Sequence, residues 1–389
     1  MPDNPIPAIE PGGMIGILGG GQLGRMTAMA ARTMGYRVRV MDPEPKCPAS
    51  FVVDEVVTGA WDDVAAAQKL ARGADAITIE IEQIGVHALA QVAELAPLRP
   101  GVEPVRIIQD KTIQKAWLAE NGFPVGPFRV VRTEFEVQTA VQALGGRVYL
   151  KIGHGGYDGR GQARIGFEAR YTEQSVSEAW KSIGERPAVV EQALDLAMEI
   201  SVMAARTPSG EVRTYPAARN HHENQILAWS VLPAGVSPEI EAKAEKLAAD
   251  IIARLGIEGL LCVEIFITRQ GRLLVNEMAP RPHNSYHASE RACVTSQFEQ
   301  LVRAVCNLPL GDVDVVQPCA IANLLGDLWI GPHGPRVPHF DRALAVPGVR
   351  LHLYEKLRPR KGRKMGHLSA VAATSDEAVK LVQKAAALL

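Results

Sequence analysis

Short apolar runs alternate with amphipathic stretches through the first hundred or so residues of the chain. The predicted strands lie at 14–18, 38–41 and 76–79, and the predicted helices lie near 22–34, 62–72 and 86–95. Strands that alternate with helices in this way form a doubly wound parallel sheet with helices on both faces. The pattern therefore predicts an N-terminal α/β domain over residues 1–109.

After residue 110 the pattern changes to helices and strands without strict alternation. We predict a central α+β domain over residues 110–310, in which the stretch at about 125–200 forms a small mobile lid. A predicted helix over 238–255 precedes two long strands. Residues 311–389 are predicted to form a small C-terminal domain, with strands near 319–324, 350–354 and 367–373 and a closing helix at 376–388.

The two long strands carry a pair of carboxylates. Residues 260–267 and 272–277 are predicted to pair across a tight turn, and a symmetric register places Glu264 opposite Glu277. Two buried carboxylates about 5 Å apart repel each other, and either a magnesium ion or neighbouring Arg and Lys side chains would relieve the repulsion. Strict alternation points Asn276 away from Glu277, so Asn276 needs a local twist to act as a third oxygen ligand.

A glycine-rich segment follows the predicted strand that ends at Lys151. Glycines at 153, 155, 156, 159 and 161 let backbone N–H groups approach phosphate oxygens closely, and Lys151 supplies positive charge. The segment is not a Walker A motif, because the Gly-Lys-Ser/Thr ending is absent. Glycines alone are equally typical of a flexible hairpin tip. Together with Lys151 and the carboxylate pair, they indicate a polyphosphate site.

Several motifs along the chain resemble those of one enzyme family. They are, in order, Gly19-Gly20-Gly21-Gln22-Leu23-Gly24-Arg25-Met26, Thr78-Ile79-Glu80-Ile81-Glu82, Asp110-Lys111 with Gln114-Lys115, Gly155 to Gln162, Val190-Glu191-Gln192, Asn276 to Ser285, and Gly362 to His367. The strings Gly-Tyr-Asp-Gly-Arg-Gly-Gln and Asn-Glu-Met-Ala-Pro-Arg-Pro-His-Asn-Ser are highly specific. The chain resembles, over essentially its whole length, the N5-carboxyaminoimidazole ribonucleotide synthetase family of ATP-grasp ligases.

The resemblance implies an ATP-grasp fold and a reaction of de novo purine (IMP) biosynthesis. ATP, bicarbonate and 5-aminoimidazole ribonucleotide would give N5-carboxyaminoimidazole ribonucleotide, ADP and phosphate by way of carboxyphosphate. The implied cofactor is Mg²⁺, as two ions, with Mn²⁺ as a substitute, and the implied assembly is a homodimer. Formate-dependent glycinamide ribonucleotide transformylase is the nearest alternative. Biotin carboxylase, glycinamide ribonucleotide synthetase and a degenerate nucleotide-binding regulator are further alternatives.

The resemblance also assigns the residues of the ATP and metal sites. Lys111 and Lys151 would contact phosphates, Glu199 would contact the ribose, and His222 would lie near the nucleotide. The adenine would meet Glu191, Gln192, Ala193 and Leu194. The closing loop would consist of Gly156, Tyr157, Asp158, Gly159, Arg160, Gly161 and Gln162. The metal ligands would be Glu264, Glu277 and Asn276, and the last two would also border ATP.

The ribonucleotide and the reacting groups would lie at the other end of the site. The substrate-binding residues that the resemblance implies are Gln22, Leu23, Glu80, Arg281, Lys356, Arg363 and Lys364. The catalytic residues that it implies are Tyr157, Asp158, Arg160, His283 and Asn284. Asp158 is our candidate for the base that accepts the amine proton.

The C-terminal cluster suggests how the phosphate of the ribonucleotide is bound. Gly362 and Gly366 bracket Arg363 and Lys364, as in a tight loop that places charged groups around a phosphate. The chain departs from the family pattern at Tyr286, where glycine is usual, and in one additional residue near 358–361. The phosphate contact could therefore belong to a neighbour of Arg363.

A dehydrogenase is an alternative from another class. Residues 19–24 satisfy G-x-G-x-x-G after a predicted strand, and Asp42 ends the next strand where a ribose-binding acid would lie. A nicotinamide enzyme has no use for the glycine-rich segment or the carboxylate hairpin. The turn at 19–24 suits an anionic substrate equally well, because helix N-termini favour negative charge.

Composition restricts the compartment and the partners. The formal net charge of −1 argues against a nucleic-acid surface. The five cysteines show no paired spacing, which predicts a reduced, cytoplasmic protein. No apolar run approaches the roughly 20 residues of a membrane span, so no membrane association is predicted.

Overall fold

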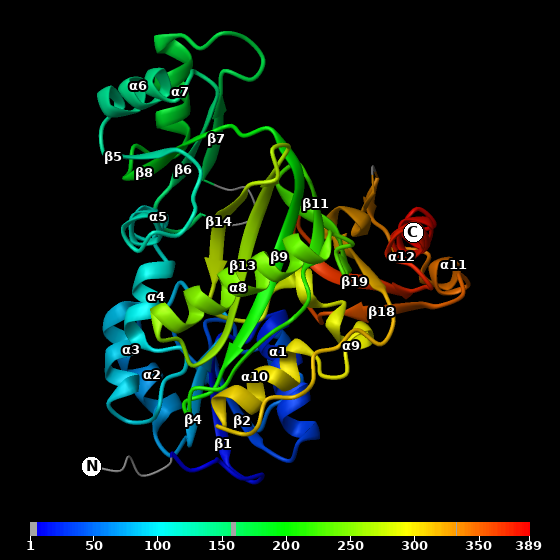
Figure 1. The fold of residues 1–389 in the computed structure, drawn as a ribbon. Coiled ribbons are helices and arrows are strands. Elements are labelled where there is room, and N and C mark those ends of the chain that lie inside the picture. Colours follow the sequence, from blue (N-terminus) through cyan, green and yellow to red (C-terminus); the bar gives the residue numbers. More distant parts are fainter. Residues whose placement is uncertain (1–5, 157–160, 332) are drawn as a thin grey trace.

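The computed structural model describes residues 6–156, 161–331 and 333–389. Tyr157, Asp158, Gly159 and Arg160, which the sequence assigns to the closing loop, lie outside the described residues. Figure 1 shows an N-terminal domain (blue to cyan) below, a small lid above it, and a large sheet that runs from the centre toward the C-terminus (red).

The N-terminal domain is the predicted doubly wound parallel sheet. Its strands are β1 (Met14–Leu18), β2 (Arg37–Asp42), β3 (Glu55–Thr58) and β4 (Ala76–Ile79), in the order β3-β2-β1-β4. All three neighbouring pairs run parallel. Its helices are α1 (Gln22–Thr33), α2 (Val64–Ala71), α3 (Val86–Ala93) and α4 (Val102–Ile108). The sequence pattern misses β3, a largely half-exposed edge strand, and α4.

The lid is an antiparallel sheet with two helices. α5 (Lys111–Glu120) leads into it, and the side chain of Asp110 caps that helix by accepting the Thr112 N–H at 2.7 Å. The lid strands are β5 (Phe128–Val131), β6 (Val148–Ile152), β7 (Gln162–Ile165) and β8 (Ala188–Gln192), in the order β5-β8-β6-β7. Its helices are α6 (Glu134–Ala143) and α7 (Glu173–Ser182). α6 lies between β5 and β6 and is not among the elements that the sequence predicts.

The large sheet joins the central and C-terminal parts of the chain. Its strands are β9 (Leu196–Arg206), β10 (Val212–Thr214), β11 (Ala218–Glu223), β12 (Ile226–Leu232), β13 (Gly259–Thr268), β14 (Leu273–Ala279), β15 (Cys319–Leu325), β18 (Val349–Leu353) and β19 (Lys364–Val371). The order is β14-β13-β9-β11-β12-β15-β19-β18, with β10 paired to β9. Because β12 pairs directly with β15, the C-terminal strands extend the same sheet.

The remaining elements are helices and a separate two-stranded sheet formed by β16 (Ile330–Gly331) and β17 (Gly334–Pro335). The helices are α8 (Pro238–Leu255), α9 (Ser289–Ala292), α10 (Gln297–Val305), α11 (Phe340–Leu344) and α12 (Ser375–Ala386). α8 has the predicted bounds. Ser237 caps its start, Pro238 occupies its first turn, and Gly256 ends it in the left-handed conformation at φ 69°.

A continuous apolar core ties the N-terminal domain to the large sheet. It contains Ile15 and Val38 from the parallel sheet, Leu260 from β13, and Leu301 from α10, all buried. This packing holds the carboxyl ends of the parallel strands close to the end of β14. None of the described helices combines the length and apolar character that a membrane crossing requires.

Candidate active site

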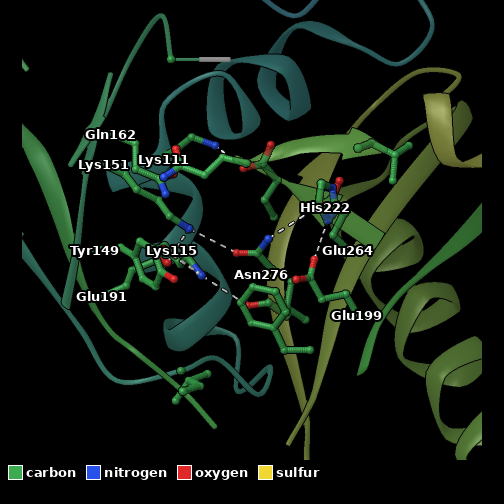
Figure 2. Close-up of a pocket in the computed structure, with 18 of the residues that line it drawn as sticks. Lys111, Lys115, Tyr149, Lys151, Gln162, Glu191, Glu199, His222, Glu264 and Asn276 are labelled. Atoms are coloured by element: carbon green, nitrogen blue, oxygen red, sulfur yellow. Dashed lines mark hydrogen bonds and ion pairs between the residues drawn. The ribbon is translucent and has the colours of Figure 1, made fainter. Parts of the chain in front are cut away.

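A cavity of about 650 Å³ lies between the lid and the large sheet. Figure 2 shows side chains from both parts pointing into it. Its lid wall includes Tyr149, Lys151, Gly156, Gly161, Gln162, Glu191, Gln192 and Leu194. Its remaining wall includes Glu82, Lys111, Lys115, Glu199, His222, Glu264, Asn276, Glu277, Arg281, His283, Asn284 and Lys364. Distant segments of the chain therefore meet in one polar cavity.

The predicted carboxylate hairpin is present. Glu264 on β13 lies directly opposite Glu277 on β14, and the register shifts by one residue between Glu264 and Ile265. Asn276 occupies the extra position of this β-bulge, and its amide donates to the Glu264 carboxylate at 3.3 Å. The bulge supplies the local twist that turns Asn276 toward Glu264, as Figure 2 shows.

The two carboxylates have different surroundings. Burial and the charge of Glu277 raise the pKa of Glu264. Burial also acts to raise the pKa of Glu277, but its ion pair with Lys111 outweighs this and lowers the pKa to about 2. His283 Nε2 lies 3.3 Å from Glu264, yet burial and the charge of Arg281 lower the pKa of His283 to about 3. Glu264 is thus bordered by an amide and a neutral imidazole, and a lysine compensates Glu277.

Glu191, near the end of β8, lies between two lysines. Its carboxylate is 3.1 Å from Lys115 Nζ and 2.7 Å from Lys151 Nζ. The side chains of Lys115 and Glu191 are only 6% and 11% exposed. Burial acts to raise the pKa of Glu191, but the two lysine charges outweigh it and lower the pKa to about 2. Lys151 also lies 3.4 Å from Oδ1 of Asn276, so it bridges the lid and the hairpin.

Lys115 is a site residue to which the sequence analysis gave no role. Its ammonium group donates to the carbonyl of Val275 at 3.3 Å, and burial lowers its pKa. A signal was available in the sequence: Lys111 and Lys115 are four residues apart in a helix, so both point to one side. Figure 2 shows Lys115 beside Glu191.

Glu199 on β9 and His222 on β11 form a hydrogen-bonded pair at the edge of the cavity. His222 Nδ1 lies 2.6 Å from Glu199 Oε2. Burial acts to lower the pKa of His222, but this hydrogen bond and the charges of Glu264 and Glu199 outweigh it and raise the pKa.

The raised pKa of His222 predicts a pH-dependent contribution to stability. The contribution is full below the unfolded pKa of about 6.5 and is lost as the pH rises through the higher folded pKa. We expect the free energy of unfolding of the wild type to exceed that of H222N most at about pH 5.5, with the difference falling above neutrality. Denaturant unfolding at several pH values measures this. H87N, at an exposed histidine of α3, is the control, and a difference that does not vary with pH would contradict the pairing.

The segment that follows Glu191 forms an apolar part of the cavity. Leu194, Leu196 and Phe266 line it, which suits the flat face of a base. The backbone N–H of Ala193 donates to the Arg147 carbonyl at 2.9 Å and fixes the path of this segment.

The opposite end of the cavity is formed by the residues after β14. Arg281 makes two hydrogen bonds, of 2.5 and 3.0 Å, with Glu82 from the N-terminal domain. Burial acts to lower the pKa of Arg281, but the charge of Glu82 raises it. Asn284 accepts from the Gln22 side chain at 3.4 Å. Arg281 was predicted to bind the substrate, and in the structure it pairs with Glu82, a residue for which the sequence predicted no role.

The glycine-rich turn before α1 is built around two carboxylates. Glu80 accepts the N–H groups of Gly21 and Leu23 at 2.5 and 3.2 Å, and burial raises its pKa. A Cβ atom on Gly21 would lie 2.3 Å from this carboxylate, which explains the glycine. Asp42 accepts the Gly20 N–H at 2.9 Å. The acid that would bind a ribose in a dehydrogenase therefore holds the turn itself.

The C-terminal basic cluster is arranged differently from the prediction. Lys364 begins β19, is 7% exposed and lines the cavity. Gly366 lies within β19, opposite Leu353, so the prediction that two glycines bracket a tight loop is wrong. The strand starts three residues earlier than its apolar pattern indicates. Lys356 donates to the Lys364 carbonyl at 2.8 Å, and Arg363 donates to the Arg358 carbonyl at 2.9 Å.

The chain matches known families along nearly all of its length. Residues 13–109 match the ribonucleotide synthetase preATP-grasp domain, 116–298 the ATP-grasp domain, and 319–381 the phosphoribosylaminoimidazole carboxylase C-terminal domain. The N5-carboxyaminoimidazole ribonucleotide synthase of Brucella melitensis is 40% identical over 364 residues, which cover 94% of this chain and 98% of the relative. The chain belongs to the N5-carboxyaminoimidazole ribonucleotide synthase family. The synthase of Bacillus subtilis is 41% identical over 369 residues, or 95% of this chain and 94% of the relative.

Solved structures of this synthase family have the same fold. An N5-carboxyaminoimidazole ribonucleotide synthetase in complex with ADP has a TM-score of 0.88 and 36% identity, with 97% of each chain covered. The synthase of Aspergillus clavatus in complex with ADP and 5-aminoimidazole ribonucleotide has a TM-score of 0.86 and 31% identity, with 96% of this chain and 98% of that chain covered. The predicted family and ATP-grasp fold are confirmed, and the dehydrogenase alternative is excluded.

Proposed function

We propose that this chain uses ATP and bicarbonate to carboxylate 5-aminoimidazole ribonucleotide in de novo purine biosynthesis. The proposal rests on a single cavity whose two ends carry different charged groups. At one end, Lys111 pairs with the partly exposed Glu277 and Lys151 pairs with the buried Glu191, an arrangement that suits a polyphosphate and its cation. At the other end, Arg281 and neutral His283 suit a small anion. Relatives solved with ADP and with the ribonucleotide support the same reading.

The hairpin fits a magnesium site. Glu264, Glu277 and Asn276 offer carboxylate and amide oxygens on one face, the ligand type that Mg²⁺ prefers. The raised pKa of Glu264 reflects a charge that a cation would neutralise. We propose Mg²⁺, as two ions, or Mn²⁺ in its place. When bound, the metal offsets the negative charge of the phosphates.

The lysines change partners in this proposal. Lys111 leaves Glu277 and Lys151 leaves Glu191 to contact the phosphates of ATP, because a polyphosphate competes with a carboxylate for each ammonium group. Gly156, Gly161 and Gln162 border the phosphates as parts of the closing loop. Glu191 to Leu194 contact the adenine, Glu199 contacts the ribose, and His222 orients Glu199.

The proposed chemistry has two steps. A bicarbonate oxygen attacks the γ-phosphorus of ATP, the bond to ADP breaks, and carboxyphosphate forms. The amine of the ribonucleotide then attacks the carboxyphosphate carbon, the C–O bond breaks, and phosphate leaves. We propose that Asp158 accepts the amine proton and that Tyr157 and Arg160 also take part in catalysis. Arg281, His283 and Asn284 hold the bicarbonate in place, so the catalysis is positioning and charge stabilisation.

The ribonucleotide is proposed to lie between the N-terminal domain and the C-terminal strands. Gln22, Leu23 and Glu80 border its ring and ribose. Its phosphate is bound by Lys356, Arg363 and Lys364.

Replacing Arg363 with alanine is expected to raise the KM for the ribonucleotide by about 10- to 100-fold, the value of one charge-assisted hydrogen bond. The KM for ATP should change little. Steady-state kinetics with each substrate varied measures both. R360A, at an exposed arginine of the same segment, is the matched control. Equal effects of R363A on the two KM values would refute the phosphate role.

We also propose that the protein is a cytoplasmic homodimer that binds neither nucleic acid nor membranes. All five cysteines are free and buried, as in proteins of reducing compartments. The net charge of −1 offers no basic excess for a polyanion. The homodimer is inferred from family resemblance.

The test is ADP formation with Mg-ATP in a small matrix of substrates. It contains aminoimidazole ribonucleotide with bicarbonate, glycinamide ribonucleotide with formate, and controls that omit each component. Turnover that needs the imidazole ribonucleotide, with labelled bicarbonate carbon in the product, supports the proposal. Turnover only with glycinamide ribonucleotide and formate would move the enzyme to the transformylase reaction.

A further inference from the structure

A second group of metal-ligating side chains, none of which lines the cavity, lies where α9 meets the edge strand β18 and its neighbour β19. Glu290 of α9, His352 of β18 and His367 of β19 each offer one ligand atom, and these atoms lie within 4.8 Å of one another. The two histidines are directly opposite in the antiparallel register, with ring centroids 5.1 Å apart. This group shares no residue with the carboxylate hairpin.

The spacing of the two rings is that of imidazoles around one ion. Two imidazoles bound to one tetrahedral zinc ion have centroids about 5 Å apart, because each Zn–N bond is about 2 Å long. The Glu290 side chain is exposed and can rotate toward them. Tyr354 holds His367 through its hydroxyl, 2.8 Å from Nδ1, which leaves Nε2 for a metal.

Two side chains at this site, Glu290 and His287, have atoms that could still bind a metal. No ion pair to Glu290 is found among the described residues. The ring of His287 stacks on His367 at 4.6 Å, and its Nδ1 is buried without a hydrogen-bond partner in the part of the chain that the structure describes. Buried polar nitrogens almost always have a hydrogen-bond partner, so the environment of His287 Nδ1 is unusual.

We propose that Glu290, His352 and His367 bind one divalent transition-metal ion of the zinc type, with its fourth position open to water or His287. Two imidazoles and a carboxylate are a zinc-type ligand set, unlike the all-oxygen set of the hairpin. The ion would tie α9, which follows the Asn284 segment, to β19, which begins at Lys364. It would thereby fasten the C-terminal strands to the central part of the chain.

The experiment is a zinc titration of chelator-treated protein by calorimetry, in excess Mg²⁺ and ADP so that the hairpin is occupied. We expect the wild type to bind one equivalent. E290Q and H352N should weaken binding at least about tenfold, since each removes a ligand. H87N, at an exposed histidine, should bind as the wild type does. Glu290 is exposed and His352 is half-buried, and the unfolding temperature of each metal-free variant verifies its fold.

Cobalt substitution gives a second readout on the wild type alone. Visible absorption bands typical of four-coordinate nitrogen and oxygen ligands are expected with one equivalent of Co²⁺. Zinc affinity that is unchanged in both variants would place the ion elsewhere and overturn the proposal. The absence of stoichiometric zinc binding by the wild type would overturn it as well.

Discussion

Replacing Glu277 with glutamine is expected to reduce ATP turnover by about 10³-fold or more and to leave ribonucleotide binding unchanged. The glutamine keeps the shape of the side chain but removes the negative charge opposite Glu264. The hairpin then lacks the charge to hold a divalent cation, and Lys111 loses its partner. The proposed ribonucleotide contacts do not include Glu277, so the ribonucleotide affinity should stay within about twofold of the wild-type value.

Single-turnover kinetics and calorimetric titration of the ribonucleotide measure the two properties separately. E239Q, at an exposed glutamate of α8, makes the same chemical change away from the cavity and should behave as the wild type does. An active E277Q enzyme would refute the assignment of the hairpin as the metal site. Loss of ribonucleotide binding together with turnover would indicate a general structural defect instead.

Replacing Lys115 with methionine is expected to lower ADP affinity at least about tenfold, with a loss of about 2 kcal/mol in the free energy of unfolding. Glu191 then has only Lys151 to compensate its buried charge, and the nucleotide phosphates compete for that lysine. Nucleotide binding would leave Glu191 as an unpaired buried charge, which is costly. Lys115 is thus expected to keep Glu191 ionised while Lys151 binds the nucleotide phosphates.

K115R keeps the charge and should restore most of the affinity, whereas a purely steric role would not be rescued by the larger side chain. K243M, at an exposed lysine of α8, is the control for the loss of one positive charge. Calorimetric titration with ADP and denaturant unfolding measure the two effects. If K115M lowers the stability but leaves the ADP affinity unchanged, Lys115 has a packing role only, and the prediction is wrong.

The parts of the fold that the sequence predicted well depend on local signals. The limits of α8 follow from Ser237, Pro238 and Gly256, which act within one turn of the helix. The hairpin follows from the short turn between two apolar strands, and the β-bulge at Asn276 then sets Glu264 opposite Glu277. Such features need no knowledge of distant residues.

The parts that were missed depend on contacts between segments far apart in the chain. The Arg281–Glu82 pair joins residues 199 positions apart, and nothing near either residue indicates its partner. The start of β19 was placed too late because charged residues at Lys364 hid a strand that pairs with β15. The spacing of Lys111 and Lys115 indicates which side of the helix Lys115 occupies, but its partners on β8 and β14 are set by the way these strands lie beside α5.

The pairing of β12 with β15 makes the last seventy residues inseparable from the rest of the protein. A chain cut before Cys319 would expose the hydrogen-bonding edge of β12 along Trp229 to Leu232, and an exposed apolar edge recruits other strands and aggregates. The excised fragment would carry the matching edge of β15. Two coexpressed halves would therefore reassemble by pairing β12 with β15. The connection before Cys319 is thus a suitable point at which to split the enzyme for a complementation assay.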